Sequence, residues 1–288
     1  MSSRPAVSPL NAAEEAEIAR ALANGPGREA AFQALVTTGR RRLCVSAARP
    51  ENAHGSWERY SAVVRRRAEA TGYRLLPVAA TGDFDGCHWI AYEVGSMRSL
   101  AAERRRPWAV EPCLDLVVDL AQALDQAAED DLLPYELTPA SIFVEPRLGV
   151  LLGDFGSARE AFGGATARAG WEVAYVPPEV RRGESAEDRS GVFVCGALLH
   201  ELLTGRPPGL DPVSRWRTDV SDAIDVVVAR ATARDSLERY ESATELCARA
   251  RRALLGDLSD PPPAAAPASL PAPATDPEPS QAGPSGPG

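Results

Sequence analysis

The sequence predicts an α+β fold of two unequal parts, in which a β-rich front half is followed by a helical back half. Three observations lead to this prediction. Short β-prone segments broken by turn residues fill the region between residues 42 and 94. Apolar residues recur at helical spacing from residue 111 onward. Residues 261–288 contain 10 prolines and 7 alanines, so this tail cannot bury enough apolar surface to fold.

The front half begins with a predicted helix over residues 11–23, because Asn11 and Glu14 have the spacing of a capping box. A second short helix is expected from Arg28 to Leu35. The segment Arg42–Ala48 is short and β-prone, so we expect a strand there. A helix should follow, in which four residues recur at helical spacing: Trp57, Tyr60, Val64 and Ala68.

Three further β-prone segments are expected at residues 73–78, 78–81 and 88–94. The sequence between the last two ends in Asp-Gly at position 86, which is typical of a tight turn between two strands. The back half should then begin with a long helix from Glu111, since one of its faces is apolar: Leu114, Val117, Ala121, Leu124 and Ala128. Later helices are predicted from Val192 and from Ala223.

Composition excludes several kinds of chemistry. The chain has 288 residues and 31 basic residues of the Lys and Arg types, and all 31 are arginine. Schiff-base chemistry, a Walker phosphate loop and a lysine clamp on ATP phosphates therefore lack their defining residue. The net charge of −9 argues against nonspecific binding to nucleic acid or to an anionic membrane.

Targeting and redox signals are also absent from the sequence. The five cysteines are widely spaced and form no C-x-x-C pair, which indicates buried, reduced thiols. The N-terminus lacks the basic and then apolar order of a signal peptide. The longest apolar run, Val192–Leu203, is interrupted by polar residues. We therefore expect a cytoplasmic protein without a membrane segment.

A family resemblance rests on motifs in a fixed order. Residues 132–160 read LLPYELTPASIFVEPRLGVLLGDFGSARE, and residues 174–180 read AYVPPEV. Residues 190–208 read SGVFVCGALLHELLTGRPP, and residues 231–246 read ATARDSLERYESATEL. Together these segments resemble a eukaryotic-type bacterial Ser/Thr protein kinase, in which H-R-D-L-K-P-x-N is followed by D-F-G and Y-x-A-P-E. The resemblance covers roughly residues 40–255.

The resemblance implies a bilobal protein-kinase-like fold with a reduced β-rich N-lobe and a helical C-lobe. The expected parts are an N-terminal extension with a short helix (1–24), the N-lobe (25–94), the C-lobe (95–256) and a disordered Pro/Ala-rich tail (257–288). The tail is expected to be a plain linker, with binding to a proline-specific groove as the alternative.

The resemblance also assigns roles to residues of the back half. Asp154 of D-F-G stands at the metal position, and Ser141 replaces an asparagine ligand with a weaker oxygen donor. Glu136 stands at the position of the aspartate that accepts the substrate proton, but it is one methylene longer. Thr138 replaces a lysine that neutralises the transferring phosphate. Transition-state stabilisation should therefore be weak.

Further substitutions affect switching by phosphorylation and the support of the catalytic loop. Tyr135 replaces the arginine that holds a phosphorylated activation loop, so switching by phosphorylation of Thr166 is not expected. Pro134 replaces the first residue of the same triplet. Gly191 stands where the family has an aspartate that braces the catalytic loop. The catalytic loop and its brace have changed together.

In the front half, no phosphate-covering G-x-G-x-x-G is found. Arg49, or Ala48, stands nearest to the family's strand lysine, and Arg49 has the length to reach a phosphate. The partner glutamate should lie near residues 61–63, where there is no acid. Glu93 and Val94 correspond to the hinge, where a nucleotide would bind. A gatekeeper tyrosine at position 92 would narrow the adenine pocket.

Other positions point to structure rather than chemistry. Glu179 and Arg239 correspond to a buried ion pair of the family. Asp154 has the alternative interpretation of a turn or N-cap residue before Gly156. His200 is interpreted as a core histidine rather than a catalytic one.

These observations favour a pseudokinase, a regulatory or scaffolding module that binds a protein partner and transfers little or no phosphate. The alternative is an atypical active Ser/Thr kinase that uses Glu136, Asp154 and Arg49. A weaker alternative is a nucleotide sensor without turnover. ATP and Mg²⁺ are the cofactors that the resemblance implies, and neither nucleic acid nor a membrane is expected as a partner.

Overall fold

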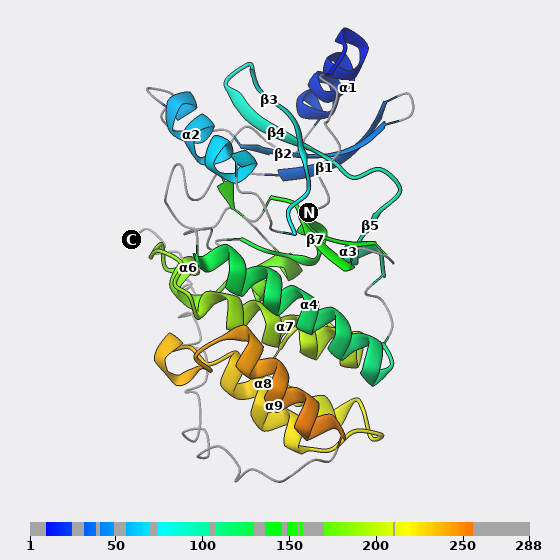
Figure 1. The fold of residues 1–288 in the computed structure, drawn as a ribbon, viewed down its shortest axis with the longest axis vertical. Helices are drawn as coiled ribbons and strands as arrows, with labels where there is room; N and C mark the ends of the chain where they lie inside the picture. The colour runs from blue at the N-terminus through cyan, green and yellow to red at the C-terminus, as the bar shows by residue number, and fades with distance from the viewer. Residues whose placement is uncertain are drawn as a thin grey trace, which may run out of the picture.

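The computed structural model describes residues 10–24, 32–38, 41–48, 56–69, 74–103, 107–129, 136–145, 149–154, 156–157, 170–209 and 211–255. The elements form an upper part with a β-sheet and a lower part made mainly of helices (Figure 1). This is the α+β architecture that the sequence predicts. The Pro/Ala-rich tail lies outside the described residues.

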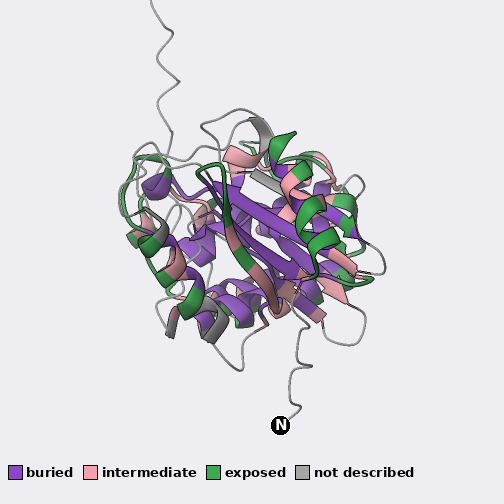
Figure 2. Ribbon diagram, turned by 90° about the horizontal axis from the view of Figure 1, so that it is seen from above, coloured by how far each residue is buried: buried purple, intermediate pink, exposed green. Residues whose placement is uncertain are grey.

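The upper part contains a four-stranded antiparallel sheet with the strand order β1-β2-β4-β3. The strands are β1 (Phe32–Thr38), β2 (Arg41–Ala48), β3 (Val78–Phe84) and β4 (Cys87–Glu93). Helices α1 (Ala12–Ala23) and α2 (Ser56–Glu69) pack on opposite faces of this sheet. Figure 2 shows the buried strands with partly exposed helices beside them.

Side chains alternate along β2, so this strand contributes to the apolar clusters on both faces of the sheet. Leu43 and Val45 join the apolar cluster of α1, whereas Cys44 joins the cluster that contains Tyr60 of α2. Helix α1 begins as predicted, because Asn11 Oδ1 accepts the Glu14 backbone N–H at 3.1 Å and the Glu14 carboxylate accepts the Asn11 N–H at 2.9 Å.

The predicted helix from Arg28 to Leu35 is wrong for its described residues. Residues 32–35 form the start of β1 and pair with residues 44–47 of β2. The β-branched residues Val36, Thr37 and Thr38 continue the strand, and pairing with β2 outweighs the local helical spacing.

The predicted hairpin is present. Asp85 and Gly86 have φ values of 51° and 70°, which is the positive-φ pair that a two-residue turn requires between β3 and β4. The predicted strand over residues 73–78 is wrong for residues 74–77. There, Leu75 forms only an isolated bridge to Leu152, and β3 begins after Pro77, which has no N–H for a ladder.

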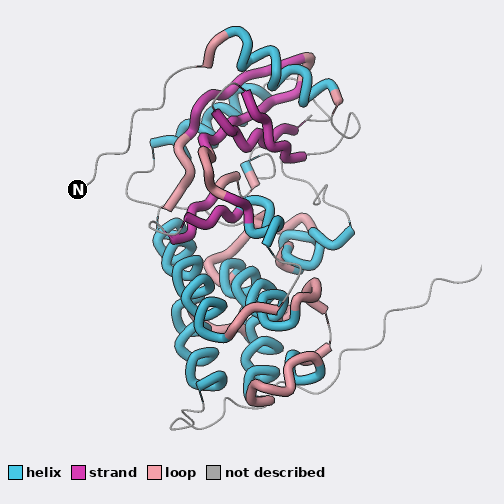
Figure 3. The backbone as a smooth tube through the Cα atoms, turned by 90° about the vertical axis from the view of Figure 1, so that its right-hand side faces the viewer, coloured by secondary structure: helices cyan, strands magenta, loops and turns pink. Residues whose placement is uncertain are grey.

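A second, three-stranded sheet lies between the two parts (Figure 3). Its order is β5-β6-β7, with β5 at Arg98–Ser99, β6 at Ile142–Glu145 and β7 at Gly149–Leu152. A 3₁₀ turn, η1 (Pro139–Ser141), leads into β6. This sheet places the end of β7 beneath the upper sheet, where the candidate site is found.

The lower part is a helical core. Its elements are α3 (Leu100–Glu103), α4 (Val110–Glu129), α6 (Pro178–Arg181), α7 (Ser190–Thr204), α8 (Ala223–Ala231) and α9 (Ala243–Leu255). Every residue of α7 is buried, with α4, α8 and α9 packed against it. The helices predicted from Glu111, Val192 and Ala223 are confirmed. In the described part of the chain, no helix is both long and apolar enough to cross a membrane.

Candidate functional site

A hydrogen bond between Ser46 and Asp154 connects the two sheets at the candidate site. Asp154 follows β7, and its carboxylate Oδ2 accepts a hydrogen bond of 2.5 Å from the Ser46 hydroxyl on β2. Both side chains are buried. Because these residues are 108 positions apart, the contact links the upper sheet directly to the turn that contains D-F-G.

The other oxygen of Asp154 is used by its own turn. Oδ1 accepts the backbone N–H of Gly156 at 3.2 Å, the backbone N–H of Ser157 at 2.9 Å and the Ser157 hydroxyl at 2.7 Å. Gly156 has φ 117°, a conformation that favours glycine. These are the contacts expected of a turn residue, which is the alternative interpretation of Asp154. A metal ion bound to Oδ2 would compete with the Ser46 hydroxyl for that oxygen.

Ser46 was missed by the sequence analysis. Spacing placed the strand lysine position at Ala48 or Arg49, whereas the strand residue that donates a hydrogen bond to Asp154 is Ser46. Arg49 lies outside the described residues. The alternation of side chains along the strand could have pointed to Ser46. Cys44, Ser46 and Ala48 share the face toward the second sheet.

The segment that resembles a catalytic loop lies beside Asp154. The backbone N–H of Gly153 donates to the Ser141 carbonyl at 2.8 Å, so Ser141 and Asp154 are held close together. Glu136, Thr138 and Ser141 are all buried. The Thr138 hydroxyl has no hydrogen-bond partner among the described residues. Pro134, Tyr135 and Thr166 lie outside them.

The hinge candidates have structural partners. The Arg41 guanidinium donates to Glu93 at 2.9 Å and to Glu14 of α1 at 3.3 Å. The Val94 N–H donates to the Arg42 carbonyl at 2.9 Å. Tyr92 is buried in the α2 face of the sheet.

Arg42 is a second residue that the sequence analysis missed. Its guanidinium donates to the carbonyl oxygens of Gly95 at 3.1 Å and Met97 at 3.3 Å. Gly95 follows Val94 directly and Met97 lies three residues after it, next to the hinge residues that the resemblance assigns, Glu93 and Val94. Arg42 is therefore bonded to two backbone carbonyls just after the hinge residues Glu93 and Val94.

Tyr60 and Val64 of α2 face the sheet, and Glu58 is exposed. Across the described ranges, no cluster of three or more His, Cys, Asp or Glu side chains could hold a metal ion.

The expected ion pair of the back half is confirmed. Arg239 donates two hydrogen bonds to Glu179, at 2.8 and 2.7 Å, and both side chains are almost fully buried. The Ser190 hydroxyl donates to the same carboxylate at 2.7 Å. Burial by itself raises the pKa of Glu179, but the bonds from Arg239 and Ser190 outweigh burial and hold the pKa below its usual value.

Gly191 and His200 occupy α7 as the sequence suggests. A Cβ on Gly191 would lie 3.6 Å from Leu124, so this position has room for a small side chain. His200 is buried, with Nε2 at 3.0 Å from the Asp211 carbonyl and without a hydrogen-bond partner for Nδ1 among the described residues. Burial lowers the pKa of His200, which agrees with a neutral core histidine.

The two-lobed arrangement and the order of its elements define a protein-kinase fold. Crystal structures of the PknI kinase domain from Mycobacterium tuberculosis superpose with a TM-score of up to 0.62. The superposition covers 80% of this chain and 92% of that domain, at 22% identity. The fold class predicted from the sequence is therefore confirmed.

Homologues of the chain are bacterial Ser/Thr protein kinases. The Ser/Thr-protein kinase PknB of Mycolicibacterium smegmatis is 31% identical over 177 residues, which cover 54% of this chain and 28% of PknB. PknJ of Mycobacterium tuberculosis is 29% identical over 213 residues, which cover 65% of this chain and 36% of PknJ. The chain thus spans about a third of the length of these relatives. No family model matches the sequence.

Proposed function

We propose that this chain is a pseudokinase, a regulatory or scaffolding module that binds a protein partner through its kinase-shaped surface and transfers little or no phosphate. The observation that carries the proposal is the bond from Ser46 to Asp154. A neutral hydroxyl meets the D-F-G carboxylate from the strand on which the kinase family has a lysine.

The charge balance of the site supports this proposal. Phosphoryl transfer depends on positioning and on cations that neutralise the phosphate oxygens. Two neutral hydroxyls, those of Ser46 and Ser157, donate hydrogen bonds to Asp154. Buried Thr138 is a third neutral group, at the position where the kinase family has the lysine that neutralises the transferring phosphate. A site with these residues does not fit Mg²⁺ and ATP well.

The hinge supports the same conclusion. An adenine that enters there would compete with the Arg42 guanidinium for the Gly95 carbonyl. By contrast, the bidentate ion pair between Glu179 and Arg239, which maintains the fold, is intact. The chain has kept the groups that hold the architecture and has lost groups that handle phosphate.

The test combines phosphoryl transfer with thermal stability. Purified protein is incubated with γ-labelled ATP and Mg²⁺ or Mn²⁺, and its melting temperature is measured with and without the nucleotide. We expect neither transfer nor a shift, whereas ATP at 100 times its Kd would add about 2.7 kcal/mol to the free energy of unfolding. Metal-dependent transfer that is lost in Glu136→Ala would refute the proposal in favour of an active kinase.

Matched variants at the strand position sharpen the test. Ser46→Lys adds an ammonium beside Asp154, and Ser46→Met adds a side chain of comparable length without charge. If the missing cation prevents nucleotide binding, ATP should stabilise Ser46→Lys and not Ser46→Met. A shift of wild-type protein without any transfer would instead indicate a nucleotide sensor.

A further inference from the structure

Two adjacent arginines at the start of β2 hold the hinge segment from opposite faces of the sheet. Side chains alternate along a strand, so Arg41 lies on the face that α1 covers and Arg42 lies on the other face. Arg41 donates to the side chain of Glu93 at 2.9 Å, and Arg42 donates to the carbonyls of Gly95 and Met97. The segment that joins β4 of the upper sheet to β5 is thus anchored twice to β2.

Helix α1 contributes a further acidic partner for Arg41. One carboxylate oxygen of Glu14 accepts a hydrogen bond from the Arg41 guanidinium at 3.3 Å and another from the Asn11 backbone N–H at 2.9 Å. The exposed fractions of the ionic side chains are 9% for Glu14, 18% for Arg41 and 27% for Glu93. Water screens a shielded ion pair less than an exposed one, so the cover that α1 provides strengthens the bond between Arg41 and Glu93.

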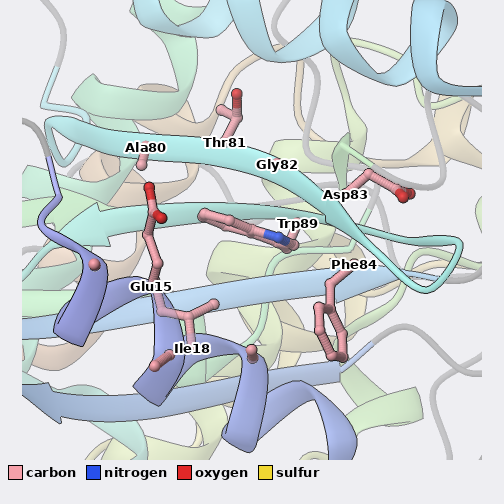
Figure 4. Close-up of a pocket in the computed structure, with 11 residues that line it drawn as sticks. Glu15, Ile18, Ala80, Thr81, Gly82, Asp83, Phe84 and Trp89 are labelled. Carbon is pink, nitrogen blue, oxygen red and sulfur yellow. The ribbon is translucent and has the colours of Figure 1, made fainter.

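Two large apolar side chains dock α1 on the sheet. Ile18 and Leu22 are buried in the cluster on its outer face, which also contains Trp89 of β4. Figure 4 shows Ile18 on α1 and Trp89 on β4. On the side of β3, a groove of about 500 Å³ separates the helix from the strand. A helix of 12 residues is marginal in water without such packing, so α1 should leave the sheet at a lower free energy than the sheet needs to unfold.

We propose that α1 controls the mobility of the hinge. While α1 is docked, Glu14 and the cover of the helix hold Arg41 on Glu93 and fix the segment that joins the two parts of the molecule. Release of α1 exposes Arg41 to water and loosens that segment. This control goes beyond the pseudokinase function and does not depend on it, because it operates whether or not the chain binds a nucleotide.

Amide hydrogen exchange, followed by NMR on ¹⁵N-labelled protein, measures the mobility of the hinge. The reporters are the backbone N–H groups of Val94 and Met97, which donate to the carbonyls of Arg42 and Val94 at 2.9 and 3.0 Å. Amides of α7 are the reference, because every residue of that helix is buried in the lower part. A local change at the hinge therefore differs from a loss of global stability.

Two charge-neutralising variants on α1 form a matched pair. Glu14→Gln keeps the capping box, in which glutamine also accepts the Asn11 N–H, but it removes the charge beside Arg41. We expect exchange at both reporters to rise about threefold, with α7 unchanged. Glu17→Gln makes the same change at a pair with the exposed Arg20, and it should leave the hinge at the wild-type rate.

Further variants separate the charge from the docking of α1. In Arg41→Gln, exchange at Val94 and Met97 should already be fast, so addition of Glu14→Gln should change nothing more. Ile18→Ala removes packing without any change of charge. It should raise exchange along α1 and at the hinge together.

The proposal is overturned if Glu14→Gln leaves the hinge at the wild-type rate, if Glu17→Gln has an equal effect, or if Glu14→Gln acts as strongly in the Arg41→Gln background. An equal rise of exchange in α7 would also overturn it, because the variants would then destabilise the whole chain. The phosphoryl-transfer assay is independent of these rates. Failure of the hinge control and failure of the pseudokinase proposal are therefore distinguishable.

Discussion

At the scale of single residues, Glu179 and Arg239 form a buried ion pair with two hydrogen bonds in the lower part. The Arg239 guanidinium also donates to the backbone carbonyls of Ala233 and Arg189, at 2.9 and 3.1 Å, so removal of the carboxylate would leave a buried charge with neutral partners only. Glu179→Gln should therefore lower the free energy of unfolding by about 3 kcal/mol, measured by urea denaturation.

The same substitution at an exposed pair is the control. Glu184 accepts two hydrogen bonds from Arg182, at 2.7 and 3.0 Å, but both side chains are about half exposed. Water screens such pairs, so Glu184→Gln should leave the urea midpoint almost unchanged. Equal midpoints for the Gln variants of Glu179 and Glu184 would show that the buried pair does not stabilise the fold.

Residue identities in the site could be predicted only in part. Asp154, Glu179 and Arg239 were identified because short motifs around them have fixed spacing. Ser46 and Arg42 were not, because no motif marks their strand and their partners are distant in sequence: Asp154 for Ser46, and Gly95 for Arg42. Only the pairing of β2 with β4 and the position of β7 bring these groups together.

At the scale of elements, local signals were sufficient where they included a cap or a turn residue. Asn11 and Glu14 fixed the start of α1, and Asp85 with Gly86 fixed the hairpin. Residues 28–35 carried neither signal, so helical spacing was misleading there. Strand β1 is determined by its seven-residue register with β2, which is a tertiary effect.

The contact between α7 and α8 is the element-scale feature with the sharpest consequence. A Cβ on Gly196 would lie 2.6 Å from the Ala231 Cβ, closer than real Cβ atoms approach. Gly196→Ala should force the helices apart and cost about 1 to 3 kcal/mol of unfolding free energy, despite the better helix propensity of alanine.

Gly191 on the same helix is the matched control. There, an added Cβ would make an ordinary contact of 3.6 Å with Leu124. Gly191→Ala should therefore leave the free energy of unfolding unchanged or raise it slightly. Thermal or urea denaturation of both alanine variants measures the difference. If both alanine variants melt together, the close approach of α7 to α8 is not the reason for glycine at position 196.

At the scale of the whole molecule, the two parts have separate apolar cores. The clusters on the two faces of the upper sheet are small, whereas the lower cluster extends through α4, α7, α8 and α9. Hydrophobic stabilisation grows with the apolar area that is buried, so the lower part should be the more stable one. The contact of Ser46 with Asp154 spans the boundary between them.

The five buried cysteines make this difference measurable. Cys44 and Cys87 lie in the upper clusters, and the other three lie in the lower one: Cys113, Cys195 and Cys247. Burial raises the pKa of Cys113 and of Cys247 to about 12, so almost no thiolate exists at neutral pH in the folded protein. Each thiol can react only after its own region opens.

Alkylation with iodoacetamide at increasing urea, followed by peptide mass spectrometry, should therefore modify the cysteines in two groups. We expect Cys44 and Cys87 to react at lower urea than the three lower cysteines, with none labelled in native buffer. If all five became reactive at one urea concentration, the two cores would unfold as a single cooperative unit. In that case the Ser46–Asp154 contact and its neighbours would couple the sheet to the helices more strongly than the separate apolar clusters suggest.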